Sequence, residues 1–362
     1  MTVTVRSFAK INLGLRIGPA RADGFHELLT VYQTIELHDV IRVSVGRGRG
    51  IEIRCEDPRV PRDESNTCFR IAERAMKALG AKGRVVIDID KRLPVQGGLG
   101  GASANAVATL LGLERALRKA LPQGEKLRIA AEVGSDLPLF LIGGAVLGVG
   151  RGEQVYPLPD FAATACVVVT PEIGVSTPKA FAEWDRLISD VKTVYETLRE
   201  DMAWARSFVE VLPEGLPPEK KREMISAERK LTVQSPSDRI KELGYGLSAW
   251  LSGLYSSAPS DLMSRGGRAG NPLLVLVRAG IENDFEQVVF PEYPELGEAK
   301  GALVRAGAKY ASLSGSGSTL YGLFVSRQAA ISAVNRLRKA GWAARATSTL
   351  SRAAYWRRMV GS

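Results

Sequence analysis

A glycine-rich segment at residues 94–104, with the sequence PVQGGLGGASA, has residue types suited to binding phosphate. Its glycines, Gly97, Gly98, Gly100 and Gly101, let the backbone approach a ligand closely and adopt positive φ angles. Because an apolar helical pattern follows directly, backbone N–H groups and the helix N-terminus would face one anion, such as the phosphates of a nucleotide. The hydroxyl of Ser103 would add a contact to phosphate or Mg²⁺. The alternative is a flexible loop with no ligand.

Two familiar phosphate motifs do not match this segment. No Gly-Lys-Ser/Thr follows it, so it is not a Walker A loop, and Ser103 stands where a dinucleotide-binding fingerprint has its third glycine. A second glycine-rich segment, residues 314–318, is expected between two strands. Alone it would be an ordinary turn, but together the two segments suggest two walls around one ligand.

Lys10 and Asp136 are the charged residues with the clearest chemical potential. Lys10 lies inside an apolar strand pattern, and a buried lysine needs a carboxylate or phosphate partner. Asp136 stands in a loop just before an apolar run, where it could accept a proton from a hydroxyl group. For each residue alone a surface charge or a helix cap is an equally simple explanation. The residue pattern does not place the two side by side.

The two histidines of the chain lie close to aromatic or acidic neighbours. Phe25 and His26 follow a turn at the entry to a strand, where they could stack on a base and hydrogen-bond to it; the alternative is a packed aromatic ring and a capping histidine. His38 and Asp39 are interpreted as a turn, because no further histidine is available to complete a metal hydrolase site.

Hydrophobic periodicity supplies the elements that must position these residues. In the first half it predicts strands within residues 3–17, 28–55 and 84–89, and residues 137–149 and 165–170 are expected to continue the apolar core. It also predicts a helix over 66–79 with Asn66 as N-cap, and a second helix after the glycine loop with Ser103 as N-cap.

The second half has its own pattern. From residue 271 it predicts a strand, helices over 281–289 and 294–306, a strand, the loop at 314–318, a strand over 320–325, a helix over 327–340 and a last strand. This order is typical of a split βαβ sandwich. Residues 183–270 between the halves are predicted to be a helical insertion.

Composition limits the class of protein. The chain has 362 residues, of which 45% are hydrophobic and 24% charged, so we expect two folded domains and no extensive disorder. No apolar stretch is long enough for a membrane span, and no secretory signal is visible. Three scattered cysteines favour a reducing, cytoplasmic location. The net charge of +10 arises largely from residues 327–358, which we interpret as a solvated basic helix and a frayed terminus.

Four segments resemble the GHMP kinase superfamily, and within it the branch that acts on a cytidine-diphosphate sugar alcohol. They are residues 9–13 with 21–26, residues 94–104, residues 134–138 with 150–153, and residues 313–318. The likeness covers residues 1–181 and 271–350. It implies an α+β fold of two domains. These would be an N-terminal domain, 1–176, like the second domain of ribosomal protein S5, and a C-terminal ferredoxin-like sandwich, 177–350, containing the insertion 183–270; a basic tail, 351–362, would follow.

The resemblance also implies roles for individual residues. Asp136 would be the catalytic base, with Lys10 as its partner, and Ser103 would be a possible ligand of Mg²⁺. The substrate would be a small molecule held by Asn12, Phe25, His26, Thr177 and Phe181, the two phenylalanines stacking on cytosine. ATP would be bound by Pro94, Val95, Gln96, Gly97, Gly98, Leu99, Gly100, Gly101, Ala102, Ser103 and Ala104, with Asn66 and Lys91 near the adenosine.

The chain departs from the pattern of the superfamily at several of these positions. Phe25 replaces a usual tyrosine, and Gln96, Ala102 and Ala104 replace Gly, Gly and Ser. Ala102 fits only if its φ is negative. The insertion 183–270 has no counterpart in the pattern; it could cap the cleft, form a homodimer surface or have no role.

Three alternatives remain open from the sequence. The chain could be another GHMP kinase, similar to homoserine or mevalonate kinases, or a non-catalytic relative of these enzymes. It could also be an S5-like nucleic-acid binder that uses the basic tail, although a phosphate loop makes nucleic acid an improbable partner. Convergence of Phe25, His26 and Phe181 on one pocket would favour the cytidine branch.

Overall fold

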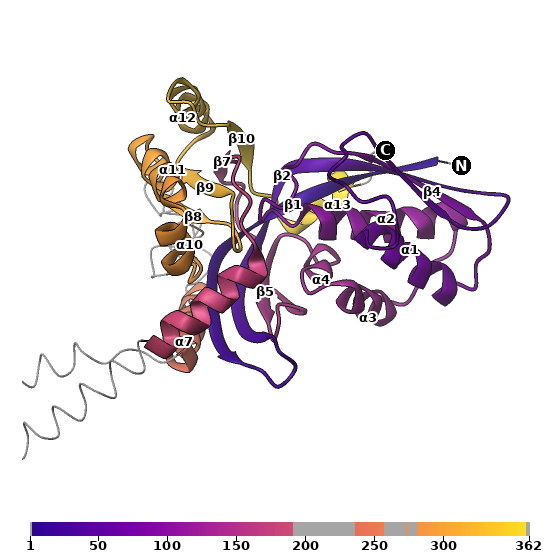
Figure 1. Ribbon diagram of the computed structural model, residues 1–362, viewed down its shortest axis with the longest axis horizontal. Helices are drawn as coiled ribbons and strands as arrows, with labels where there is room; N and C mark the ends of the chain where they lie inside the picture. Colours follow the sequence, from indigo (N-terminus) through magenta and orange to yellow (C-terminus); the bar gives the residue numbers. More distant parts are fainter. Residues whose placement is uncertain (1, 191–235, 257–272, 274–280, 360–362) are drawn as a thin grey trace, which may run out of the picture.

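Two β-sheets divide the protein into two lobes (Figure 1). The computed structural model describes residues 2–190, 236–256, 273 and 281–359. Among these residues no helix combines the length and the apolar character needed to cross a membrane.

The N-terminal lobe contains a mostly antiparallel sheet with helices packed on one face. Its strands are β1 (Thr2–Ala20), β2 (His26–Gly46), β3 (Ile51–Cys55), β4 (Arg84–Asp90), β5 (Ala145–Val149) and β6 (Gln154–Pro157), in the order β3-β4-β2-β5-β6 with β1 paired to β2. Its helices are α1 (Thr67–Ala78), α2 (Gly101–Leu117), α3 (Gln123–Val133) and α4 (Leu137–Phe140). Residues 104–114 of α2 are all buried, which makes this helix the centre of the lobe.

The C-terminal lobe has a four-stranded antiparallel sheet in the order β10-β7-β9-β8. The strands are β7 (Ala165–Val169), β8 (Tyr310–Leu313), β9 (Leu320–Phe324) and β10 (Ala344–Ser348), and the helices between them are α10 (Glu286–Glu292), α11 (Pro294–Arg305) and α12 (Arg327–Lys339). This is the split βαβ arrangement expected from the sequence. β7 pairs with the C-terminal strands although it precedes the predicted domain boundary at residue 176.

The β1–β2 hairpin runs through both lobes (Figure 1). Val3 and Val5 at the start of β1 belong to the core of the N-terminal lobe. Ile11 lies in a central cluster, and Leu15 and Ile17 belong to the core of the C-terminal lobe. One strand therefore contributes to every core cluster, and the residues in its middle lie where the lobes meet.

The described part of the insertion packs against the lobes. Residues 177–190 are helical and bury Trp184, and α7 (Pro236–Ser256) buries Leu243 and Leu247 in the central cluster. Arg239 of α7 lies over the ring of Trp184 and donates to the buried carboxylate of Asp284. The remainder of the predicted insertion, 191–235 and 257–270, lies outside the described residues.

Several predictions about local structure are wrong, and each error has a physical reason. His38 and Asp39 are not a turn; they lie inside β2, because pairing with β1 continues through them, and pairing with β4 begins at the next residue, Val40. Ser103 is not the N-cap of α2, since the left-handed Gly100 lets the helix begin at Gly101. The helix predicted at 281 begins at Glu286, because the Asn283 side chain bonds to other loop carbonyls and to the Phe285 N–H.

The predicted frayed C-terminus is also wrong. Residues Arg352–Met359 form α13, which lies against β1 and buries Tyr355 and Met359. The Tyr355 hydroxyl donates to the Phe140 carbonyl, and the Trp356 indole donates to the Ile142 carbonyl. The apolar side of this short basic helix thus completes the N-terminal core. The strand predicted just after residue 271 falls almost entirely outside the described residues.

Candidate active site

The two glycine-rich segments are in direct contact. The Ser314 hydroxyl donates to the Gly98 carbonyl at 2.9 Å, and the Thr319 N–H donates to the Gly97 carbonyl at 3.2 Å. Gly98 has φ +73°, and a Cβ atom there would lie 2.1 Å from the Ser314 carbonyl oxygen. The close approach therefore requires glycine at this position, and the two glycine-rich segments lie against each other. That they enclose one ligand stays a prediction.

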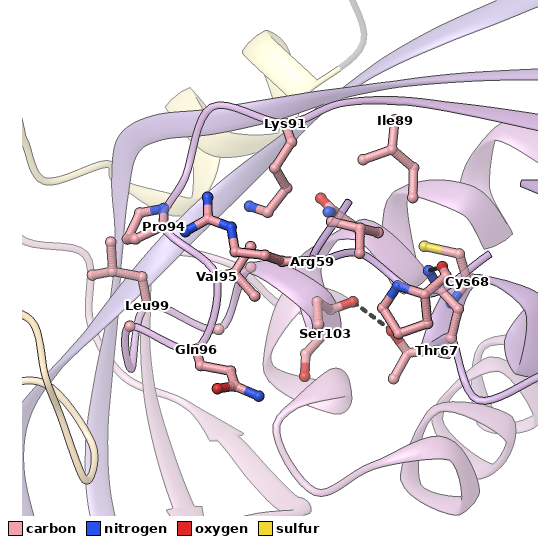
Figure 2. Close-up of a pocket in the computed structure, with 18 of the residues that line it drawn as sticks. Arg59, Thr67, Cys68, Ile89, Lys91, Pro94, Val95, Gln96, Leu99 and Ser103 are labelled. Carbon is pink, nitrogen blue, oxygen red and sulfur yellow. Dashed lines mark hydrogen bonds between the residues drawn. The ribbon is translucent and has the colours of Figure 1, made fainter. Parts of the chain in front are cut away.

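A cavity of about 350 Å³ opens between the first glycine segment, the start of α1 and Lys91 (Figure 2). The N-terminus of α2 faces it, which favours an anion. Of the residues predicted to bind ATP, all line this cavity except Ala104, whose side chain is buried in the lobe. Asn66 lines it while also capping α1, because its Oδ1 accepts from the Cys68 N–H, as predicted.

Asp39 is a residue that sequence reasoning missed. Its fully buried carboxylate accepts from the Lys91 ammonium at 2.8 Å, from the Asn105 amide at 2.9 Å and from the backbone N–H groups of Arg92 and Leu93. Lys91 also donates to the Leu93 carbonyl. Asp39 thus fixes both the base of the glycine segment and a lysine in the cavity wall. From the sequence, Asp39 is interpreted as part of a turn, and nothing near it in the sequence indicates that it lies behind the cavity wall.

The departures from the superfamily pattern have different structural consequences. Ala102 lies in α2 and has no positive φ, so alanine fits at this position without backbone strain. Gln96 has φ +57°, in the left-handed region where a side chain is strained.

We expect Gln96→Gly to stabilise the protein by about 1 kcal/mol, because glycine adopts this φ without the Cβ clash. Urea unfolding measures the change in the free energy of unfolding. The control is Gly80→Ala, which introduces the same strain at φ +56° where no atom lies near the new Cβ. It should change the free energy of unfolding by a similar amount in the opposite direction. A destabilised Gln96→Gly variant would show that the glutamine side chain contributes more than the strain costs.

Lys10 and Asp136 come together beside this cavity. Lys10 is almost fully buried, and its Nζ lies 3.4 Å from Asp136 Oδ2 and donates to Asn12 Oδ1 at 2.6 Å. The Lys10 N–H also bonds to the Leu99 carbonyl, which fixes β1 to the glycine segment. Asp136 precedes α4 but makes no capping bond with its side chain. Its carboxylate is one-third exposed and therefore accessible to a ligand.

Tyr32 is the second residue that the sequence did not reveal. Its hydroxyl donates to Asp136 Oδ1 at 3.1 Å, and Lys10 Nζ lies 5.6 Å from the centre of its ring. Burial, together with the charge of Asp136, raises the pKa of Tyr32 well above its usual value, so the phenol keeps its proton.

The residues expected to hold a base are only partly assembled. His26 stacks directly on Phe181, with ring centres 4.9 Å apart and 13° between the planes, and its Nε2 donates to Asp185 Oδ1 at 2.7 Å. Phe25 is half exposed, and the Arg151 guanidinium covers one face of its ring at 4.8 Å. A base can therefore enter between His26 and Phe181 only if one ring turns away.

Thr177 connects this region to the second glycine segment. Its hydroxyl lies 2.7 Å from the Ser316 hydroxyl, and both residues line a cavity of about 430 Å³ that also reaches Gln96 and Gly98. The predicted substrate residues thus form three groups: Asn12 beside Lys10, Thr177 beside the glycine segments, and the rings around His26.

The fold and this site define a class of protein. The model of the GHMP kinase N-terminal domain matches residues 66–144, and the model of the GHMP kinase C-terminal domain matches residues 271–342. The protein is a GHMP kinase, an ATP-dependent kinase of small molecules, and the predicted fold is confirmed.

Relatives place it more narrowly. It is 35% identical to the 4-diphosphocytidyl-2-C-methyl-D-erythritol kinase of Solibacter usitatus, over 92% of this chain and 84% of that protein. It is 34% identical to the kinase of the same name from Acaryochloris marina, over 90% and 88% of the two chains. The chain belongs to this family of 4-diphosphocytidyl-2-C-methyl-D-erythritol kinases.

Solved structures agree with this placement. The crystal structure of a 4-(cytidine 5'-diphospho)-2C-methyl-D-erythritol kinase matches with a TM-score of 0.62 at 25% identity, over 96% of this chain and 98% of that one. The homoserine kinase of Cytophaga hutchinsonii matches with a TM-score of 0.61 at 17% identity, over 97% and 95% of the chains, and shows the shared fold alone.

Proposed function

We propose that this kinase transfers the γ-phosphoryl group of ATP to the 2-hydroxyl of 4-diphosphocytidyl-2-C-methyl-D-erythritol, in isoprenoid precursor biosynthesis. The observation that carries the proposal is the Lys10–Asp136 pair, 3.4 Å apart and fixed to the glycine segment through the Lys10 N–H. The names of the relatives supply the substrate.

In this proposal Asp136 is the general base and Lys10 its cationic partner. Asp136 removes the proton of the substrate hydroxyl as that oxygen forms a bond to the γ-phosphorus, and the bond from this phosphorus to the β–γ bridging oxygen breaks, releasing ADP. Lys10 stabilises the negative charge that develops between Asp136 and the phosphoryl group. Asn12 accepts from Lys10 and thereby holds the ammonium in place.

The N-terminus of α2 and the glycine segment would bind the phosphates of ATP through backbone N–H groups. Mg²⁺ is compatible with this cavity, because the ion typically binds phosphates, waters and only one or two protein oxygens. Ser103, whose side chain lies at the cavity in the first turn of α2, is the candidate protein ligand. Bound with ATP, the ion would neutralise phosphate charge.

The experiment that tests this function is a comparison of substrates. The purified protein with Mg-ATP should release ADP with the cytidine diphosphate substrate and not with homoserine or mevalonate. Turnover with either of the other alcohols alone would assign the chain to a different GHMP activity. ATP binding without turnover of any of the three would favour a non-catalytic relative. A homodimer and a cytoplasmic location stay predictions.

We expect His26→Ala to raise the KM for the cytidine substrate at least tenfold and the KM for ATP less than twofold. The stack on Phe181 and the bond to Asp185 place this imidazole away from the glycine cavity, so its loss should affect base recognition alone. An unpaired base-reading group costs about 1–3 kcal/mol. Steady-state kinetics with each substrate varied in turn checks this result, and equal changes in both KM values would contradict base reading. His38→Ala is the matched control.

A further inference from the structure

The packing around the Tyr32 ring fixes the direction of its hydroxyl. The residue lies on β2 between Asn12 of β1 and Val146 of β5 and is 2% exposed. A Cβ atom at Gly148 would lie 2.5 Å from Tyr32 Cε2, and one at Gly152 would lie 2.5 Å from the Tyr32 hydroxyl. Two glycines therefore make room for this ring, and its hydroxyl points at the Asp136 carboxylate.

The two oxygens of Asp136 have different partners. Oδ1 accepts from the Tyr32 hydroxyl at 3.1 Å, whereas Oδ2 lies 3.4 Å from Lys10 Nζ. A carboxylate that rotated freely would present either oxygen to a substrate. With Oδ1 engaged by a fixed phenol, the carboxylate plane is set, and Oδ2 remains beside the ammonium that would stabilise the developing charge.

We propose that Tyr32 is a positioning residue for the phosphoryl transfer, which holds Asp136 Oδ1 so that Oδ2 receives the proton of the substrate hydroxyl. The inference rests on the proposed role of Asp136 as base and deepens it. Tyr32 itself does not take the proton: the bond that breaks is the O–H bond of the substrate, the proton ends on Oδ2, and the phenol donates its hydrogen bond throughout.

The charged groups around the base are unchanged when only the Tyr32 hydroxyl is removed. Among the described residues, the other charged groups facing Asp136 and Tyr32 are Lys10 on β1 and Glu153 with its partner Arg151 in the 150–153 loop. All three keep their side chains in a Tyr32→Phe variant, so a loss of rate there would come from the orientation of the Asp136 carboxylate.

The test is the steady-state kinetics of Tyr32→Phe, which keeps the ring under Lys10 and deletes one oxygen. We expect kcat to fall about threefold to tenfold and both KM values to stay within twofold, because the lost bond orients the base and does not bind substrate. The control is Tyr355→Phe, which removes an equally buried hydroxyl that bonds to the Phe140 carbonyl, and its kcat and KM values should match the wild type.

An unchanged kcat in folded Tyr32→Phe, with Asp136→Asn inactive, overturns the inference and leaves the base intact. An active Asp136→Asn variant overturns the base and this inference together. If Tyr32→Phe does not fold, Gly152→Ala tests the same contact, since its Cβ would displace the hydroxyl. Its kcat should then fall while both KM values stay within twofold, and an unchanged kcat again overturns the inference.

Discussion

Asp136→Ala should fold normally and transfer phosphoryl groups at least a thousandfold more slowly than the wild type. General bases contribute about 10²–10⁴ to rates, and this one would also lose its pairing with Lys10. The fold should survive because the carboxylate is one-third exposed and does not cap α4. Lys10 keeps its hydrogen bond to Asn12 in the variant, so its ammonium retains an acceptor.

The measurement is ADP release per mole of folded protein, with thermal unfolding and ATP binding recorded on the same samples. Glu132→Ala is the matched control: it removes a carboxylate from α3, just before Asp136 in the chain, that pairs only with surface arginines among the described residues. Its kcat should lie within twofold of the wild type. Asp136→Ala turnover within tenfold of the wild type would remove Asp136 from the role of base.

Gly98→Ala should weaken ATP binding at least tenfold. The new Cβ would meet the Ser314 carbonyl oxygen at 2.1 Å, a contact with backbone that cannot be relieved by rotating a side chain. The left-handed φ of +73° adds roughly 1–2 kcal/mol of strain. The two glycine segments must then separate, which breaks the bonds from Ser314 to Gly98 and from Thr319 to Gly97 and moves the N–H groups that would hold phosphate.

Titration calorimetry with ATP measures this effect directly. Gly80→Ala is the control that separates backbone strain from the steric clash. Gly80 has φ +56°, but no atom lies within 4 Å of the place that a Cβ would take. It should lose about 1 kcal/mol of stability and keep its ATP affinity. If Gly98→Ala bound ATP as tightly as Gly80→Ala does, the contact between the two segments would have no part in nucleotide binding.

Local signals in the sequence were sufficient for most elements and for the cavity beside the first glycine segment. Asn66 as N-cap, the glycine segment before α2 and the order of elements in the C-terminal lobe depend on neighbours within a few residues, which the sequence displays. The meeting of Lys10 with Asp136 depends on strand pairing and on the packing of α4 over long sequence separations. Only the resemblance to a known superfamily implied it.

The site residues that could not be predicted from the sequence have partners far away in the chain and belong to residue types that are common at such positions. Asp39 meets Lys91 and Asn105 across 52 and 66 positions, and Tyr32 meets Asp136 across 104. A tyrosine in an apolar strand pattern signals only a buried ring. The His26–Phe181 stack likewise forms between a strand and the helical residues 177–190, so the sequence could suggest the two rings but not that they would close on each other.

The β1–β2 hairpin runs through both lobes, and this limits how two such kinases can be recombined. Because β1 buries Val3 in one core and Ile17 in another, both lobes depend on the same strand for part of their hydrophobic cores. Exchanging a C-terminal half with that of a relative at residue 176 would therefore leave a foreign core packed on the native Leu15 and Ile17. Recombination within this family should succeed only where the part of the hairpin that carries Leu15 and Ile17 comes from the same parent as the C-terminal half.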